Sequence, residues 1–134
     1  MKTTKADDWF SRWIRLRDAW ESNGVLVAKC CTCNAIRDVR RIDCGHYRKR
    51  QHMATRFHES NALPQCKPCN GWEQGDPERM AVAIDRKFGD GTAEYLRGLE
   101  KRVYKPDVGL IEMAYREKVN DLLKQRGWER YKWW

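Results

Sequence analysis

The stretch of sequence that decides the fold lies between Cys30 and Asn70. It contains CCTC at residues 30–33, DCGH at residues 43–46, an asparagine at position 61, and CKPCN at residues 66–70. Each Cys-x-x-Cys pair places two thiols on one tight turn, and two such turns can supply four ligands to a single metal ion. The stretch therefore predicts a small fold held together by a metal ion, with a hairpin in the interval between the two pairs.

A structural zinc site is the chemistry that the cysteines favour, because four thiolates form a closed tetrahedral site. Cys31 could replace Cys30 as a ligand, although a Cys-x-Cys pair is the poorer chelate. Buried free thiols and a redox pair are the alternatives, but no thioredoxin-like βαβ pattern surrounds either pair. Cys44 is expected to be a small buried strand residue. The predicted zinc ligands are Cys30, Cys33, Cys66 and Cys69.

Positive charge is concentrated around this stretch. The 134 residues carry a net charge of +8, which favours a polyanionic partner over a solvated basic face that only maintains solubility. Residues 29–58 contain eight Lys or Arg against two Asp or Glu, and residues 97–134 contain ten against six. Residues 59–96 contain four against seven. The excess therefore coincides with the central motif and with the C-terminal third.

The cellular compartment is predicted from what the sequence lacks. No apolar run approaches the roughly 20 residues of a membrane span, and the N-terminal residues do not form the apolar segment of a signal peptide. We therefore expect no membrane association and a reducing cytoplasm. In that compartment the six cysteines indicate metal binding rather than disulfides.

The predicted fold class is α+β, in one domain that covers residues 1–134. An aromatic stripe predicts an N-terminal helix within residues 7–22, which Asp7 or Asp8 caps and Ser22-Asn23-Gly24 ends. The zinc-stabilised core is expected at residues 25–75, and a helical C-terminal region at residues 76–134. Within these regions, strands are predicted at residues 25–27 and 36–42, followed by a hairpin return and a loop over residues 48–60. Helices are predicted over residues 76–89 and 106–126, with a short helix between them that begins at residue 92.

A second constellation could carry chemistry, because zinc held by four thiolates has no open position. His46 is a candidate general base, since an imidazole can take a proton from water at neutral pH. Asn61 could accept a hydrogen bond from the other ring nitrogen and fix its tautomer. Asp43 and Asn70 offer oxygen ligands that suit a hard divalent ion such as magnesium. For any one of these residues alone, a satisfied core or turn position would be the simpler interpretation.

The order of these motifs resembles the HNH endonucleases, whose site is a β-hairpin followed by a helix, the ββα-metal fold. More closely, the chain resembles the lambdoid-phage NinG/Rap recombination nucleases, over about residues 7–100. The resemblance rests on the opening helix around Trp9-Phe10-Ser11-Arg12-Trp13 and on Asp43-Cys44-Gly45-His46-Tyr47, Arg56-Phe57, Asn61, Gln65-Cys66, Cys69-Asn70 and Gly75.

The resemblance implies a role for each motif residue. His46 would activate water, Asn61 would orient the base and the hairpin, Asn70 would bind the catalytic magnesium or manganese ion, and Asp43 would be its second ligand. The chain departs from many HNH sites because Gly45 stands where an acidic or histidine ligand often precedes the base. His52 and His58 could touch the metal or the leaving phosphate, with solvent-facing loop positions as the alternative.

The implied activity is metal-dependent, structure-specific cleavage of branched DNA, namely Holliday junctions and D-loops, in the host cytoplasm if a phage encodes the protein. Nearly two-fold symmetric substrates also suggest a homodimer. A non-catalytic, zinc-stabilised DNA-binding recombination accessory protein is the alternative, and a protein-interaction domain is disfavoured by the basic cluster. Residues 128–134 could stack on bases or pack within the protein. The predicted phosphate contacts are Arg40, Arg41, Arg48, Lys49, Arg50 and Arg56.

Overall fold

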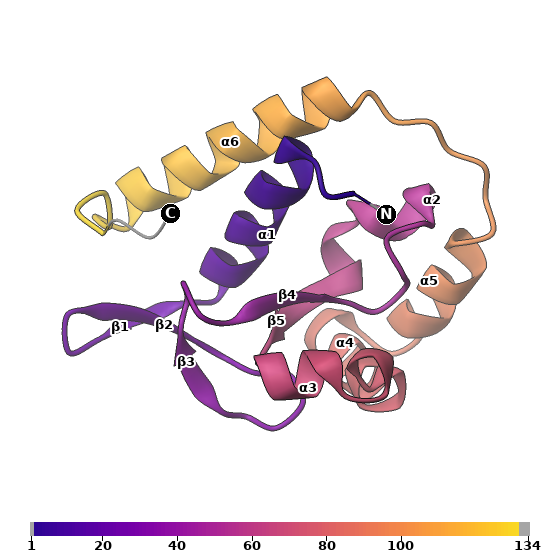
Figure 1. The fold of residues 1–134 in the computed structure, drawn as a ribbon, viewed down its shortest axis with the longest axis horizontal. Helices are drawn as coiled ribbons and strands as arrows, with labels where there is room; N and C mark the ends of the chain where they lie inside the picture. The colour runs from indigo at the N-terminus through magenta and orange to yellow at the C-terminus, as the bar shows by residue number, and fades with distance from the viewer. Residues whose placement is uncertain (1, 132–134) are drawn as a thin grey trace.

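The computed structural model describes residues 2–131 and has the predicted α+β composition (Figure 1). Its strands form two small antiparallel sheets, one of three strands in the order β1-β2-β3 and one of two strands, β4-β5. Among the described residues, no helix is both long enough and apolar enough to cross a membrane. The strands are β1 (Trp20–Ser22), β2 (Val25–Lys29), β3 (Ile36–Asp38), β4 (Asp43–His46) and β5 (Ala62–Gln65). The helices are α1 (Lys5–Arg17), α2 (Met53–Arg56), α3 (Lys67–Gly71), α4 (Pro77–Phe88), α5 (Thr92–Leu99) and α6 (Val108–Gln125), with 3-10 turns η1 (Glu59–Asn61) and η2 (Glu73–Gly75).

The N-terminal helix α1 is displaced from its predicted position at both ends. Its cap is Thr4, which forms a reciprocal capping box with Asp7, so the prediction that Asp7 or Asp8 caps the helix is wrong. The helix ends at Arg17 because the next residues form strand β1, which pairs with β2. Asn23 and Gly24 both have positive φ and form the two-residue turn of this hairpin, the conformation that an Asn-Gly pair favours.

The hairpin that contains His46 closes later in the chain than predicted. Strand β4 pairs with β5 in a register that places Asp43 opposite Gln65 and His46 opposite Ala62. Residues 48–60, predicted to contain the hairpin return, instead hold the short helix α2 and the start of η1. The predicted strand over 36–42 is also shorter, because the chain turns after Asp38 and enters β4.

The later helices follow their local signals closely. Asp76 caps α4, Pro77 is its first residue, and the helix ends at Phe88 before Gly89, as predicted. Helix α5 begins at Thr92, and α6 lies within the predicted range of 106–126. Helix α3 follows β5 directly, so the chain has the predicted order of hairpin and then helix (Figure 1).

Helix α6 packs along α1 and completes the core (Figure 1). The aromatic stripe of α1 is core, as predicted, since Phe10 and Ile14 are fully buried against Tyr115 of α6. Trp20, which was expected to continue this stripe, instead lies in β1 and is exposed. Burying a side chain of this size from each helix gives the main attraction between them. The C-terminal tail partly packs as well, because Trp128 and Tyr131 contact the core cluster around Leu123. Residues 132–134, the rest of the predicted aromatic tail, lie outside the described residues.

Candidate functional site

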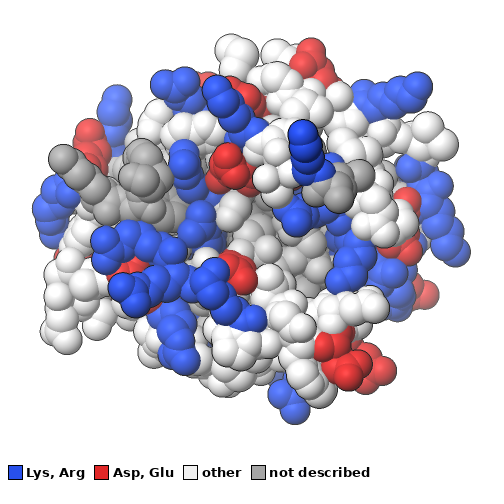
Figure 2. All heavy atoms as spheres, viewed as in Figure 1, with Lys and Arg blue, Asp and Glu red and all other residues white. Residues whose placement is uncertain are grey.

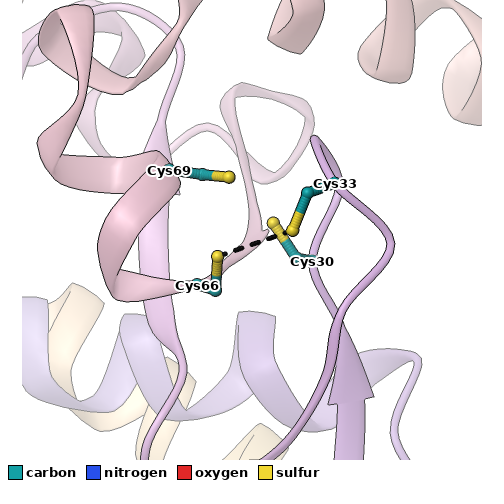
Figure 3. A group of neighbouring side chains, drawn as sticks. All are labelled: Cys30, Cys33, Cys66 and Cys69. Carbon is teal, nitrogen blue, oxygen red and sulfur yellow. Dashed lines mark hydrogen bonds between the residues drawn. The ribbon is translucent and has the colours of Figure 1, made fainter.

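The four predicted cysteines form one cluster (Figure 3). Their sulfur atoms all lie within 4.8 Å of one another, and the Sγ atoms of Cys33 and Cys66 are 3.7 Å apart. Zinc–sulfur bonds of about 2.3 Å in a tetrahedron require sulfur atoms about 3.8 Å apart. The cluster therefore fits a zinc ion in both geometry and donor chemistry. Cys31 is not part of it, which settles the choice between Cys30 and Cys31.

The cluster joins two parts of the chain that are far apart in sequence. Cys30 follows β2 and Cys33 lies in the next turn, where Asn34 takes a left-handed conformation and its N–H donates to the Cys30 carbonyl. Cys66 is the N-cap of α3, and Cys69 lies within that helix. A metal ion at this point would therefore tie the three-stranded sheet to α3, and with it Asn70.

A cleft of about 410 Å³ lies next to this cluster along β4. Figure 2 shows the molecule hollowed near the centre of this face, with Lys and Arg side chains gathered on either side. Five of the predicted site residues line the cleft, and they come from β4, the following loop and α3. The lining residues are Thr3, Asp7, Asp8, Ser11, Asp43, Cys44, His46, Lys49, Arg50, Asn70 and Gln74.

Asp43 and Asn70 contact each other within this cleft. The Asn70 amide nitrogen donates to Asp43 Oδ2 at 3.1 Å, which leaves the Asn70 amide oxygen as its possible cation ligand. Asp43 Oδ1 also pairs with the Lys67 ammonium at 2.6 Å. A carboxylate and an amide oxygen are the donor types that hard divalent ions bind, and in the structure the Lys67 ammonium occupies one of the carboxylate oxygens. The structure thus brings together the two residues predicted to bind the catalytic metal.

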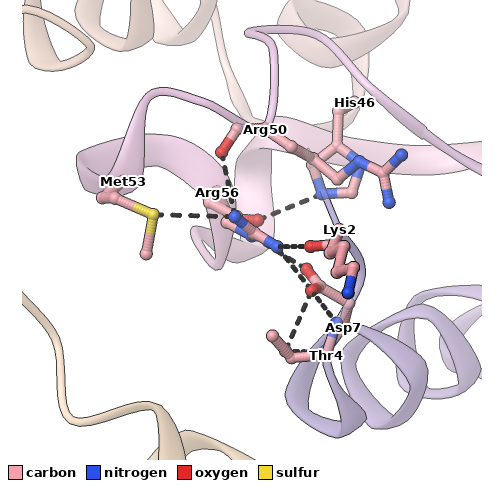
Figure 4. A network of polar contacts seen from close by, with 7 residues as sticks. All are labelled: Lys2, Thr4, Asp7, His46, Arg50, Met53 and Arg56. Carbon is pink, nitrogen blue, oxygen red and sulfur yellow. Dashed lines mark hydrogen bonds and ion pairs between the residues drawn. The ribbon is translucent and has the colours of Figure 1, made fainter.

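His46 is held by a backbone carbonyl (Figure 4). Its Nε2 lies 3.1 Å from the carbonyl oxygen of Arg56. Since a carbonyl can only accept, Nε2 carries the proton and the neutral ring keeps Nδ1 as its basic nitrogen. Burial lowers the pKa of His46 to about 4 against the opposing effect of this hydrogen bond, and the positive charge of Arg50 lowers it further. The imidazole is therefore neutral at physiological pH.

Asn61 does not contact His46 in the way predicted. Its side-chain oxygen accepts from the Arg48 N–H at 2.8 Å, and its amide nitrogen donates to the Arg48 carbonyl at 3.1 Å. The side chain is fully buried, and it joins the two ends of the loop that follows β4. Asn61 therefore fixes the hairpin, while the tautomer of His46 is set by Arg56.

Arg56 is a buried structural residue, not a phosphate contact as predicted. Its guanidinium forms two hydrogen bonds to Asp7 at 2.9 and 2.6 Å, and both side chains are only 6% exposed (Figure 4). This ion pair attaches the first turn of α1 to the segment whose carbonyl holds His46. Sequence reasoning missed this role because the two partners lie 49 positions apart.

A family model places the chain among known proteins. The model described as Bacteriophage Lambda NinG protein matches residues 3–125. The chain belongs to this family. Comparisons with curated proteins and with solved structures gave no match.

The remaining predicted basic contacts of this NinG-family chain divide into two groups. Lys49 and Arg50 line the cleft, and the Lys49 ammonium is anchored on the Gln74 carbonyl at 2.8 Å. Arg48 instead forms a two-pronged ion pair with Glu100, which makes it structural. Arg40 and Arg41 are exposed away from the lining, and Arg40 pairs with Asp38.

His52 and His58 do not line the cleft. The Nε2 atom of His52 lies 3.5 Å from Glu100. His58 caps η1 by accepting a hydrogen bond from the Ser60 N–H. Both positions therefore fit the structural alternative considered for them, and the candidate site of this family member contains one histidine among the described residues.

Gly45, the unusual residue before His46, is explained by packing. A Cβ atom at this position would lie 2.5 Å from Oε1 of Gln65. The Gln65 side chain is fully buried and donates to both Thr32 and the Gly75 carbonyl at 2.8 Å. Gln65 thus links the first cysteine turn to the loop after α3, and only glycine leaves it room.

Proposed function

We propose that this NinG-family chain is a metal-dependent, structure-specific DNA endonuclease of the HNH type. It would hydrolyse phosphodiester bonds in branched recombination intermediates such as Holliday junctions and D-loops. The observation that carries the proposal is the composition of one cleft, which contains a histidine of fixed tautomer, two oxygen ligands and two cationic side chains. The order β4, β5, α3 agrees with a ββα-metal core.

In this proposal the protein side chains position water and phosphate. Nδ1 of His46 takes a proton from water, the resulting hydroxide attacks phosphorus, and the bond to the 3′ oxygen breaks, with that oxygen taking a proton from solvent. Asp43 and Asn70 would hold a magnesium or manganese ion, and such an ion would stabilise the charge that develops on the phosphate. Lys67 is 67% exposed and can release Asp43 to that ion. Zinc at the four cysteines would have a structural role.

Cationic side chains at the cleft support a nucleic-acid substrate. Lys49 and Arg50 enter the lining directly, and they can bind the phosphates that flank the scissile bond. The net charge of +8 provides a longer-range attraction to DNA. Neither feature reads base sequence, and this favours recognition of DNA structure.

Cleavage assays on matched substrates test the proposal. The substrates are a labelled four-way junction, a D-loop and a linear duplex, each with magnesium or manganese. We expect wild type to cut the branched substrates, and His46→Ala to bind them equally well but cut them about 10²–10⁴-fold more slowly, the usual contribution of a general base. His52→Ala is the matched control, because His52 lies outside the cleft, and it should cut normally.

Two results would contradict the nuclease. If wild type binds all three substrates and cuts none with either metal, the alternative of a non-catalytic accessory protein replaces it. If His46→Ala cuts as fast as wild type, the assignment of the base is wrong.

A homodimer is part of the proposal. Leu110 and Met113 are three residues apart on α6 and are both largely exposed, so they form one apolar strip on its outer side. Light scattering should give twice the monomer mass for wild type and the monomer mass for Leu110→Glu. A wild-type monomer at micromolar concentration would remove the dimer from the proposal.

A further inference from the structure

A second pocket, which we call the Trp20 pocket, has a mainly apolar floor. It measures about 330 Å³ and shares no lining residue with the cleft. Its lining comes from β1, β2, β5 and α4 and from the first cysteine turn, where Cys30, Cys31 and Asn34 take part. Ala28, Leu63, Pro64 and Ala83 are further apolar members. The indole of Trp20, which is 39% exposed, lies in the same lining. An apolar surface of this size beside an exposed aromatic ring fits a flat, mostly apolar ligand.

The rim of the Trp20 pocket is cationic. Lys29, Arg86 and Lys87 line it, and Asp18 is its single acidic residue. Asp18 pairs with Lys87 at 2.6 Å, which leaves the charges of Lys29 and Arg86 in excess. Both of these side chains are exposed. The pocket therefore attracts an anion at its edge while its floor favours an apolar group.

The position of the pocket separates it from the cleft. Residues of the first half of α1 line the cleft, whereas Asp18, just past the end of α1, lines the Trp20 pocket. A helix of 13 residues is about 20 Å long at 1.5 Å per residue. A ligand in the pocket is thus distinct from the phosphate at His46, but both can belong to one DNA molecule.

We propose that the Trp20 pocket binds an unpaired nucleotide of branched DNA. The base stacks on Trp20 over the apolar floor, and its phosphate lies between Lys29 and Arg86. Stacking on an aromatic side chain tolerates any base, because every base has a π-face. This inference deepens the proposed function and rests on DNA being the substrate. It gives the protein a physical means of distinguishing a branch with an unpaired base, such as the edge of the displaced strand of a D-loop, from continuous duplex.

Photo-cross-linking tests the contact directly with the intact protein. The probe is a four-way junction that carries 5-iodouracil at an unpaired position in one strand at the branch. After digestion with trypsin, we expect the cross-link on the peptide of residues 18–29, in which Trp20 is the only aromatic residue. Trp72, at the end of α3, is also exposed. A cross-link on Trp72 instead, or one found equally with 5-iodouracil placed within paired duplex, would overturn the proposal.

Binding measurements provide the second test. Fluorescence anisotropy, without added divalent ion, compares a junction with unpaired thymines with a fully paired linear duplex. Trp20→Ala should weaken binding of the junction about fivefold or more and leave duplex binding unchanged, and Trp20→Phe should restore most of the loss. Arg86→Glu should also weaken junction binding. Tyr95→Ala is the control, since Tyr95 is an exposed aromatic residue of α5 outside both sites.

The outcomes separate this inference from the nuclease. If Trp20→Ala weakens binding of the junction and of the duplex equally, or weakens junction binding no more than Tyr95→Ala does, the Trp20 pocket is not a nucleotide site. The cleavage result is unaffected by that outcome. Selective junction binding through Trp20 together with normal cleavage by His46→Ala would support the pocket and contradict the proposed base. Circular dichroism and zinc content establish that each variant is folded.

Discussion

The cysteine cluster and the cleft share helix α3, yet they are built in different ways. The cluster takes its four sulfur atoms from two short local turns. The cleft draws its lining from α1, β4, the loop after β4, and α3. The two cysteines of each pair lie within four residues, so the sequence shows directly that they can bind one metal ion. A cleft, in contrast, depends on how distant elements pack. The two regions should therefore respond differently to mutation, and the following predictions test that difference.

Loss of the cluster should have the largest effect. In Cys66→Ser, zinc should be lost and the chain should unfold, because zinc binding to structural sites contributes on the order of 10 kcal/mol to folding. Zinc content and thermal melting by circular dichroism measure this. Cys31→Ser is the matched control, since Cys31 neighbours the cluster without joining it, and it should keep its zinc. Equal zinc loss in both variants would contradict the assignment of the ligands.

Breaking the Asp7–Arg56 ion pair should have the next largest effect on stability. Asp7→Ala leaves the buried Arg56 charge without its carboxylate and should lower the free energy of unfolding by about 3–5 kcal/mol. Arg40→Ala breaks an exposed pair with Asp38 and should cost about 0–1 kcal/mol. Urea denaturation compares the two. Because Asp7 lies in the cleft region, the zinc content of folded Asp7→Ala should be unchanged, and zinc loss would show that the two regions are coupled.

The same ion pair has a defined pH dependence. Burial raises the pKa of Asp7, but hydrogen bonds from Arg56 and Thr4 outweigh this effect and hold the pKa below its ordinary value. Its stabilisation is therefore complete above about pH 4 and is lost as the pH falls through the lowered pKa. Wild type should lose more stability on acidification than Asp7→Asn, which has no carboxylate to titrate. Identical pH profiles of the two proteins would contradict this account.

Filling the space at Gly45 should have a moderate effect. In Gly45→Ala the added Cβ would lie 2.5 Å from Oε1 and 3.0 Å from Cβ of Gln65. Because Gln65 is fully buried, the resulting overpacking should cost about 1–3 kcal/mol. Gly98→Ala in α5 is the control, since nothing lies within 4 Å of its Cβ position, and it should stabilise by about 0.5–1 kcal/mol. A neutral Gly45→Ala would show that Gln65 can move.

The titration of His46 is the subtlest test. Its pKa is lowered to about 4, first of all by burial, so the ring should stay neutral from pH 7 to about pH 5. Between the unfolded pKa of about 6.5 and the folded one, the unfolded chain binds more protons, and stability should fall as the pH falls. Nitrogen NMR of the imidazole should show a proton on Nε2 at neutral pH. A midpoint near 6.5, or a proton on Nδ1, would contradict the hydrogen bond to Arg56.

Local chemistry explains what sequence reasoning predicted well. Each Cys-x-x-Cys pair, the start of α4 at Asp76-Pro77 and the buried face of α1 depend on residues within one turn or one helix. The placement of Asp43 beside Asn70 agrees with the roles that the resemblance implied, and it arises because β4 pairs with β5, which leads directly into α3. The Asn-Gly turn after β1 was present in the sequence but was interpreted as the end of a helix.

The tertiary structure alone decided the partners of the polar side chains. Arg48 and Arg56 are cationic residues of the kind that binds phosphate, yet each is paired with a carboxylate that lies about 50 positions away in the sequence. Asn61 bonds the Arg48 backbone, and the Arg56 carbonyl orients His46. The sequence by itself determined which residues could bind metal and which helices could form. Burial, which arises only when distant segments pack, determined which charges needed a partner inside the protein and which stayed available at the cleft.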